Sequence, residues 1–483
     1  MAKLKNIIKQ LSIDDYQAIY NSLMSSNAEK SAYLLKFMRE KQLSDTKIME
    51  ELDVNTNAYY TLRSRLNQKI EEYLLQQMES PRTDLLKKVA NINEIIFTKK
   101  RAIAIATLKK LEKELLDYDL SNELTIIYKT LKKLHINTPD FFAYSQSYNK
   151  HVAYMLAIDK AEDLLADYFR KYGNYTLSGG DTEKLELTLL NREMDNVCRL
   201  YQSHRLYVYQ NCMSIFHRLF VENTESMNDG QEPIEDVLAN VEKIFTQYYQ
   251  DSIYFHLKLV FEFLKLEYYT HYKVFKKAEK YFDEVNDAAS TLLTNYSLYT
   301  YPSQFLFTKV FRHIRMDTEG QMYDENEGLF QDYEADAQDL PKYMSYIVYR
   351  ALSCYYAKRY DEAARWINNL LNEMSLKKYP FAQLEVKLLL ALQYCLMSDY
   401  ELFSQLLNSI QRQIRILGKD SCDSMLLFTK LLKTSLYDSK NGKAAKVRLL
   451  VDKMNKTDSR TFSLLSLVKM DESFVNRLSS QNG

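Results

Sequence analysis

Residues 343–371 read YMSYIVYRALSCYYAKRYDEAARWINNLL and predict two consecutive helices. Ala351 and Ala363 lie twelve positions apart, a Tyr-Asp-Glu triplet stands just before the second alanine, and Ile367 and Leu370 follow it. Small residues let two helices approach closely, and the apolar residues after them can cover a neighbouring unit. The pattern therefore predicts an antiparallel helix pair that packs against further pairs.

The composition of the whole chain also favours helices. Gly (9) and Pro (6) supply 15 of 483 residues, about 3%, where average usage gives about 12%. Hydrophobic residues make up 46% and charged residues 27% of the chain, which is enough for a large core and too much charge for a membrane protein. Collagens, disordered linkers and turn-rich β-sandwiches fit poorly. An all-α chain of this length is usually built from helix pairs stacked in one dimension.

The spacing in residues 343–371 resembles a tetratricopeptide repeat (TPR). The small positions of that family are its eighth and twentieth, here Ala351 and Ala363, and large apolar positions follow at the twenty-fourth and twenty-seventh. Two positions depart from the pattern, since Ile347 replaces an aromatic residue and Ser375 stands where a proline would close the repeat. The resemblance implies a degenerate TPR-like α-α solenoid of antiparallel helix pairs.

Two weaker copies of the pattern occur elsewhere in the chain. The first copy consists of Tyr269, Ala278, Phe282 and Val285, with Leu266 at the small position. The second lies in residues 99–111, where either Ala102 or Ala104 can be the packing alanine. An irregular helical bundle in which short alanine-bearing helices mimic the pattern remains the alternative.

Helix-breaking residues suggest how the chain is divided. Ser80 can cap a helix that begins at Pro81, because proline fills the first helical position without losing a needed N–H group. We therefore expect a helix-turn-helix-like helical domain at residues 1–80 and a TPR-like solenoid at residues 81–483, with a further subdivision possible near 317–341. Other helix breaks are expected at residues 173–181, Gly230, Pro233, Gly418 and Gly442.

The charges balance overall, with 64 Lys and Arg against 64 Asp and Glu, but their distribution is uneven. Residues 1–115 carry 20 basic and 15 acidic side chains, residues 400–483 carry 14 and 8, and the middle therefore carries 30 and 41. Residues 317–339 hold nine acids and no base, which predicts either an exposed loop or a solvated connecting helix. A general polyanion-binding or membrane-surface protein is not indicated.

Residues 43–66 read LSDTKIMEELDVNTNAYYTLRSRL and predict a helix, a tight turn and a second helix. Ser44 can cap the first helix, whose Ile48 and Leu52 face inward. Thr56 can cap the second helix. The apolar stripe of that second helix consists of Ala58, Leu62, Leu66 and Ile70.

This helix-turn-helix resembles the last DNA-reading domain of bacterial sigma factors, where a similar apolar spacing precedes a basic second helix. Met49 departs from the family's small position, and Asp53 replaces its turn glycine, where a positive φ carries a steric cost. The resemblance implies DNA contact through residues 44–70 by a homodimer, because two half-sites are usually read together. A helix-turn-helix used only for dimerisation or packing is the alternative that we keep open.

The DNA-binding hypothesis assigns roles to seven residues of the second helix. The basic side chains can position the phosphate backbone, and the exposed polar side chains can contact base edges. The candidates for base edges are Asn57, Tyr60, Thr61 and Ser64. The candidates for the backbone are Arg63, Arg65 and Lys69.

The TPR resemblance also implies a partner-binding groove. Inward-facing positions of the family, transferred onto the best copy, nominate Ser345, Val348, Leu352, Tyr355 and Tyr356. Tyrosine is common at the energetic centres of protein interfaces, which suits such a groove.

Sequence patterns for catalysis and metal binding are missing. None of the seven histidines lies in an HExxH motif, and the five cysteines form no CxxC pair. We therefore expect no catalytic residue, no metal and no cofactor. The odd cysteine count favours a reducing compartment, and neither a secretory signal at residues 1–10 nor a bilayer-spanning segment is indicated. These features predict a cytoplasmic protein without a membrane partner.

Two functions follow from these patterns. The leading hypothesis is a non-enzymatic interaction scaffold, bacterial in character, that binds a peptide or protein partner in a groove of helical repeats. The alternative is a cytoplasmic transcription regulator that joins the DNA-binding helix-turn-helix to a TPR-like sensor or oligomerisation domain.

Overall fold

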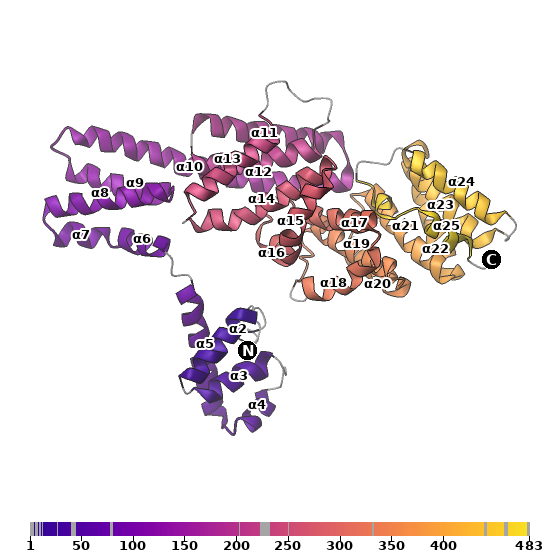
Figure 1. The fold of residues 1–483 in the computed structure, drawn as a ribbon, viewed down its shortest axis with the longest axis horizontal. Helices are drawn as coiled ribbons and strands as arrows, with labels where there is room; N and C mark the ends of the chain where they lie inside the picture. The colour runs from indigo at the N-terminus through magenta and orange to yellow at the C-terminus, as the bar shows by residue number, and fades with distance from the viewer. Residues whose placement is uncertain are drawn as a thin grey trace. The chain divides into compact units, whose positions relative to one another are not determined.

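The chain folds into helices that follow one another mostly through short turns (Figure 1). No strand occurs among the residues that the structure describes, which confirms the all-α prediction. Contacts divide the chain into two compact units, Met1–Tyr148 and Asn149–Gly483. The computed structural model describes residues 4, 8, 11, 13–26, 28–39, 45–77, 81–201, 203–222, 232–249, 251–330, 333–438, 442–457 and 462–480.

The first helices of unit 1 surround a small core of their own. They are α2 (Ile13–Ser25), α3 (Glu29–Arg39), α4 (Asp45–Glu51) and α5 (Thr56–Gln77). Ile19, Leu23 and Leu35 are almost fully buried in this core, whereas Ile13 at the start of α2 is 75% exposed.

The remaining helices of unit 1 enclose a second core. They are α6 (Pro81–Ala90), α7 (Ile92–Thr98), α8 (Arg101–Asp117) and α9 (Ser121–Leu134). As predicted, a helix begins at Pro81, while its expected cap Ser80 lies outside the described residues. The proposed domain boundary at residue 80 falls between the two cores, and independent folding of the two parts stays a prediction.

The described residues in the first half of unit 2 form eight α-helices and a short 3-10 helix. Their bounds are α10 (Asp140–Ser178, which begins in unit 1), α11 (Asp181–Leu200), α12 (His204–Phe220), α13 (Ile234–Gln247), α14 (Ser252–His271), α15 (Phe275–Asp287), α16 (Ala289–Asn295), α17 (Ser303–Met316) and η2 (Glu319–Gln321). Their core is rich in aromatic rings, including Tyr168, Tyr172, Phe216 and Phe261.

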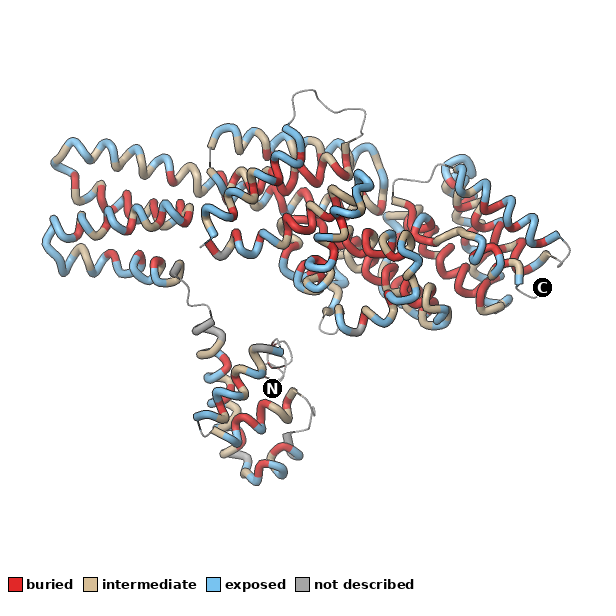
Figure 2. Tube along the Cα trace, viewed as in Figure 1, coloured by how far each residue is buried: buried red, intermediate tan, exposed pale blue. Residues whose placement is uncertain are grey.

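The second half of unit 2 contains residues 343–371, whose spacing predicted a helix pair. Its bounds are α18 (Met322–Leu329), α19 (Leu340–Tyr356), α20 (Tyr360–Glu373), α21 (Pro380–Met397), α22 (Tyr400–Leu417), η3 (Asp420–Cys422), α23 (Asp423–Tyr437), α24 (Lys443–Lys456), η4 (Leu464–Leu467) and α25 (Glu472–Ser479). Buried residues concentrate where neighbouring helices face one another (Figure 2). The expected helix breaks are confirmed at Gly418, which follows α22, and at Gly442, which precedes α24, with φ of 91° and 76°.

The three predicted repeat copies coincide with packed helices. Helix α19 packs against α20, and Ala351 and Ala363 are both buried, as the pattern predicted. Helices α14 and α15 form the second pair, with Ala278 buried. In the third copy Ala104 is the packing alanine, because it is 1% exposed while Ala102 faces solvent. Membership of the TPR family itself stays a prediction.

The turns of successive hairpins share one backbone geometry. A residue other than glycine adopts a positive φ just after the first helix of each pair, and the next N–H group bonds to a carbonyl five residues back, at 2.8 to 3.0 Å. This arrangement satisfies carbonyls that the helix end would leave unpaired and reverses the chain. The residues with positive φ in α14–α15, α19–α20 and α21–α22 are Lys273, Lys358 and Ser398.

The expected break at residues 173–181 is wrong in its first half. Helix α10 continues through Gly173 and ends at Ser178, and the chain turns at Gly179, whose φ is 65°. A Cβ atom at position 173 would lie 3.0 Å from the Cβ of Pro341. Gly173 therefore serves close packing inside a helix, which local sequence rules read as a break.

The acidic residues 317–339 are neither a simple loop nor a fully solvated helix. Helix α18 lies within them, and Met322 and Asn326 of this helix are buried. Glu325 pairs with the buried Lys309, and hydrogen bonding from His313 lowers the pKa of Glu325 to about 2. Bases from other helices thus neutralise part of this run.

Candidate functional site

The residues proposed for a groove lie on α19, and most are already covered. Ser345, Val348, Leu352 and Tyr355 are each 3% exposed or less, and Tyr356 is half-buried. Val348 and Leu352 belong to the core of this half of unit 2. Tyr355 and Tyr356 meet residues 462–480, which we call the C-terminal segment, and a partner could reach them only if this segment moved. The Ser345 hydroxyl donates a hydrogen bond to the carbonyl oxygen of Pro341.

Tyr356 holds the main chain of the C-terminal segment. Its hydroxyl donates a hydrogen bond to the carbonyl oxygen of Leu467 at 2.7 Å and accepts one from the N–H group of Lys469 at 2.9 Å. Burial raises the pKa of the Tyr356 phenol well above its usual range, so the hydroxyl keeps its proton. Because both contacts reach backbone atoms, they depend on the path of the peptide and not on its side chains.

Glu385 holds the start of the same segment. This carboxylate is 2% exposed and lies on α21. One oxygen accepts a hydrogen bond from the Ser463 hydroxyl at 2.8 Å, and the other accepts one from the N–H group of Leu464 at 2.7 Å. A carboxylate is tolerated at such depth when its oxygens are hydrogen-bonded, which the C-terminal segment provides here.

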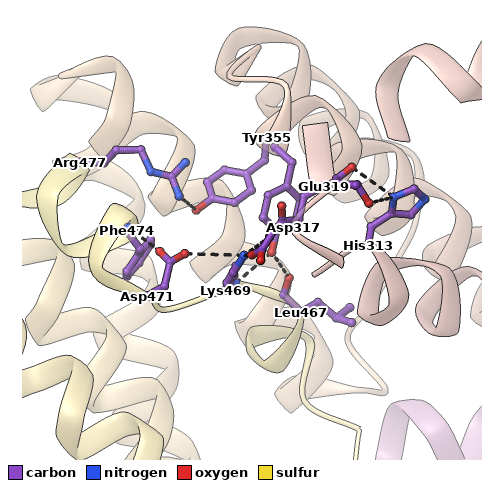
Figure 3. A network of polar contacts seen from close by, with 11 residues as sticks. His313, Asp317, Glu319, Tyr355, Leu467, Lys469, Asp471, Phe474 and Arg477 are labelled. Atoms are coloured by element: carbon purple, nitrogen blue, oxygen red, sulfur yellow. Dashed lines mark hydrogen bonds and ion pairs between the residues drawn. The ribbon is translucent and has the colours of Figure 1, made fainter. Parts of the chain in front are cut away.

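Lys469 of the C-terminal segment forms ion pairs with acidic residues of the stretch 317–339 (Figure 3). Its ammonium group pairs with Asp317 and, at 2.5 Å, with Glu319, and lies 3.8 Å from Asp471. Hydrogen bonds to Asp317 and then Glu319 raise the pKa of Lys469 above its ordinary value, so the charge is retained. Asp317 is presented at the end of α17 with a φ of 54°.

Arg477 ties the last helix of the segment to α19. Its guanidinium donates a hydrogen bond of 3.2 Å to the hydroxyl of Tyr355 and also lies over that ring, 5.3 Å from the centroid (Figure 3). The C-terminal segment therefore contacts α21, α19 and the end of α17 in turn.

A cavity of about 280 Å³ lies beside the C-terminal segment. Its wall is mostly apolar and includes Phe220, Phe307 and Phe311, together with the predicted groove residue Ser345. Phe462, Leu464, Ser466 and Leu467 of the segment form another side. Burial lowers the pKa of His271, which also lines the cavity, and so favours its neutral form.

Sequence analysis identified the α19 residues of this site but did not predict that the C-terminal segment contacts them. Glu385 carried a usable signal, since it is a lone acid in the apolar stretch 384–392. Asp317 and Glu319 were noticed only as part of an acidic run. The partner of both, Lys469, lies about 150 residues later, and no local pattern connects such distant positions.

The predicted helix-turn-helix in unit 1 has the expected local geometry. Ile48 and Leu52 face inward, and Asp53 adopts the positive φ, 47°, that the turn requires. Helix α5 begins at Thr56, but its cap is Asn55, whose side-chain oxygen accepts a hydrogen bond from the N–H group of Ala58 at 2.9 Å. The predicted cap of α4, Ser44, lies outside the described residues.

The apolar stripe of α5 is only partly buried. Leu66 and Ile70 are fully buried, whereas Ala58 and Leu62 are half-buried. The burial of Tyr59 was not predicted. Its side chain is 1% exposed and packs in the core at the first turn of α5, where Ala58 was expected.

The candidate DNA-contacting residues are mostly accessible. Tyr60 is 50% exposed, and Thr61, Ser64, Arg65 and Lys69 also face solvent. The side chain of Asn57 lies outside the described part of the chain.

The basic side chains of α5 are not gathered on one face. The guanidinium of Arg63 lies over the Tyr59 ring at 5.8 Å, and Lys69 pairs with Glu72 at 2.8 Å. Arg65 and Lys69 border a surface cavity that Ser26 and Lys30 also line. The exposed polar residues form a surface that a duplex could meet, but its positive charge is divided and partly neutralised.

Other features bear on the class of protein. Within the described ranges, no group of three or more His, Cys, Asp or Glu side chains is placed to hold a metal ion. No described helix combines the length and the hydropathy needed to cross a bilayer. The five cysteines, all within the described residues, form no disulfide.

Comparison of the chain with protein-family models, with curated proteins and with solved structures found no match. The fold and site define a class of architecture: an all-α chain of consecutive helix hairpins in which residues 463–469 lie against α21, α19 and the end of α17, and α25 packs on α23 and α24.

Proposed function

We propose that this chain is a non-enzymatic, cytoplasmic interaction protein that binds a short peptide segment of a protein partner in the groove beside α19. The observation that carries the proposal is the way in which Tyr356 and Glu385 bind main-chain groups of the C-terminal segment. Groups that recognise a peptide backbone suit a peptide-binding surface. The adjoining apolar cavity offers room for a partner side chain.

An unbiased library of displayed peptides tests this function. Binders are selected on the full chain and then measured on Phe311→Asp, which places a charge in the cavity wall at a residue that is 43% exposed. The matched control is Phe255→Asp on α14, at an exposed phenylalanine that does not line the cavity. Peptides that bind the wild type and the control but lose about tenfold or more on Phe311→Asp support the function. A library without such binders contradicts it.

The second candidate function is transcription regulation through the helix-turn-helix of unit 1. The solvent-facing Tyr60, Thr61 and Ser64 on α5 favour it, because these side chains can reach base edges in a groove. Under this proposal the protein acts as a homodimer on two half-sites, and unit 2 senses a peptide or contributes to oligomerisation.

Salt dependence of duplex binding tests the regulator proposal. Affinity for random duplex should fall linearly on a log–log plot against salt, and Arg63→Ala or Arg65→Ala should each reduce the slope by about 1. Arg365→Ala, on an exposed residue of α20, serves as the control and should leave the slope unchanged. Absence of duplex binding at low salt would leave only the interaction function.

A further inference from the structure

We propose that residues 463–469 are an internal ligand of the groove, and that the partner is a peptide of the same chemistry that competes with them. This inference rests on the proposed function and names its partner class. The expected peptide has a hydroxyl residue first, apolar residues next, and a Lys or Arg six positions after the hydroxyl residue. In this chain those positions are occupied by Ser463, Leu464, Leu467 and Lys469.

Three binding points define this pattern. Glu385 on α21 accepts hydrogen bonds from the hydroxyl of Ser463 and from the N–H group of Leu464. Tyr356 on α19 donates a hydrogen bond to the carbonyl oxygen of Leu467 and accepts one from the N–H group of Lys469. Asp317 and Glu319 form ion pairs with the ammonium group of Lys469 at the end of the pattern. The receptor groups come from three separate elements, so any peptide that follows the same path meets the same groups.

Charge selects the last position of the peptide. Asp317 and Glu319 lie in a run of nine acids without a base, and the surrounding field favours a cation at the end of the bound segment. An acidic residue at this position would face both carboxylates and be repelled. The partner therefore carries Lys or Arg where this chain has Lys469.

The cavity gives a partner a way to displace a segment that is covalently tethered. Ser466, whose side chain is small, polar and exposed, lines this cavity of about 280 Å³. A cavity of roughly 150 Å³ already accommodates a benzene ring. A partner with a Phe or Leu at the position of Ser466 would bury apolar surface there that the internal segment does not, and so gain affinity over it.

Fluorescence anisotropy with two labelled peptides tests the inference. One peptide has the sequence of residues 462–470, and the other carries Ser466→Phe. Both are titrated with the full-length wild type, with Lys469→Glu, whose tethered segment is repelled by Asp317 and Glu319, and with the control Lys453→Glu on the exposed face of α24. Competition by the tethered segment reduces the apparent affinity to the intrinsic affinity multiplied by the fraction of molecules whose groove is open.

The expected result is an affinity for the Ser466→Phe peptide at least about tenfold higher on Lys469→Glu than on the wild type. Lys453→Glu should match the wild type, and the native-sequence peptide should bind about tenfold more weakly than its Ser466→Phe form. Reversing the charge within the peptide by Lys469→Glu should abolish binding. Equal affinities on the wild type and Lys469→Glu, or no effect of charge in the peptide, would overturn the inference.

A second pair of measurements keeps the test decisive if Lys469→Glu folds poorly. In the full-length protein, Ser466→Phe should let the tethered segment fill the cavity and so lower the affinity for the free peptide about tenfold. Hydrogen exchange of residues 462–470 should speed up when the Ser466→Phe peptide binds the wild type, because the segment leaves the groove. Unchanged affinity and unchanged exchange would show that the segment is only a structural cap.

The outcomes separate this inference from the proposed function. If library peptides bind in a manner sensitive to Phe311→Asp but do not compete with the 462–470 peptide, the groove function stands and the internal-ligand inference falls. If no peptide binds the groove by either route, both fall.

Discussion

The hydroxyl of Tyr356 donates a hydrogen bond of 2.7 Å to the carbonyl oxygen of Leu467, 111 residues later in the chain. Tyr356 is the last residue of α19, and Leu467 ends the short helix η4. The same hydroxyl accepts a hydrogen bond from the N–H group of Lys469, so one side chain spans three consecutive residues of the C-terminal segment. This contact is the point at which a distant part of the chain is held against the predicted groove.

Removing that hydroxyl should lower the free energy of unfolding by about 1–3 kcal/mol, because Tyr356→Phe leaves a carbonyl and an N–H group without this partner. Urea denaturation followed by circular dichroism measures the change. Tyr437→Phe, at an exposed tyrosine of α23, is the control and should change stability by less than about 0.5 kcal/mol. Equal effects of the two substitutions would show that the contact contributes little.

The packing alanine of α8 should tolerate enlargement poorly. Ala104→Leu should destabilise the protein by about 1–3 kcal/mol, because a larger side chain must displace neighbours in a filled core. Ala102→Leu makes the same chemical change at an exposed position two residues earlier and should be nearly neutral. Thermal melts of the two variants, compared with the wild type, check this prediction. Similar losses at both positions would contradict the burial of Ala104.

The hairpin turn between α19 and α20 should accept glycine. Lys358 has a φ of 62°, a conformation that costs a residue with a Cβ roughly 1–2 kcal/mol, while glycine adds some entropy to the unfolded chain. Lys358→Gly should therefore stabilise the protein by up to about 1 kcal/mol. Lys280→Gly, at an exposed position in the interior of α15, should have the opposite sign, near 1 kcal/mol destabilising. Chemical denaturation of both variants decides the matter by the sign of the difference.

Stability should depend on pH through a buried acid of α14. Glu267 is 2% exposed, its carboxyl accepts a hydrogen bond from Thr308 at 2.9 Å, and burial raises its pKa to about 8. Between pH 4.5 and 8 the unfolded chain releases this proton while the folded chain retains it. The free energy of unfolding should therefore fall as the pH rises through this window, by about 1.4 kcal/mol per pH unit at most.

The variant Glu267→Gln should remove this component of the pH dependence. Unfolding free energies at pH 5 and pH 8 are compared for the wild type, for Glu267→Gln and for the control Glu401→Gln, at an exposed position of α22. The control should follow the wild type. A slope that persists in Glu267→Gln would mean that other groups cause it.

Sequence analysis predicted the helices and hairpins, but it did not predict that the C-terminal segment covers the groove. The spacing of Ala351 and Ala363 predicted a packed helix pair because helical faces repeat every three to four residues. The same reasoning placed Tyr355 and Tyr356 in an open groove. Both meet the C-terminal segment instead, since the residues that reach them lie more than 100 positions away in the chain.

Glycine and aspartate show where local rules are sufficient and where they are not. Asp53 stands where the sigma-factor pattern has a turn glycine, and it adopts the positive φ of the turn despite the steric cost, because turn geometry depends on a few neighbouring residues. Gly173 was expected to break a helix and instead lies inside α10, because its missing side chain makes room for Pro341.

Helix formation, the hairpin pairs and the basic and acidic regions of this chain follow from amino-acid order, since propensity, capping and apolar periodicity act over a few residues. Packing across the folded chain settled three other matters: which alanine faces the core, which acids meet Lys469, and what fills the groove beside α19. Each of these depends on groups brought together from distant positions, where contact energies outweigh local preference.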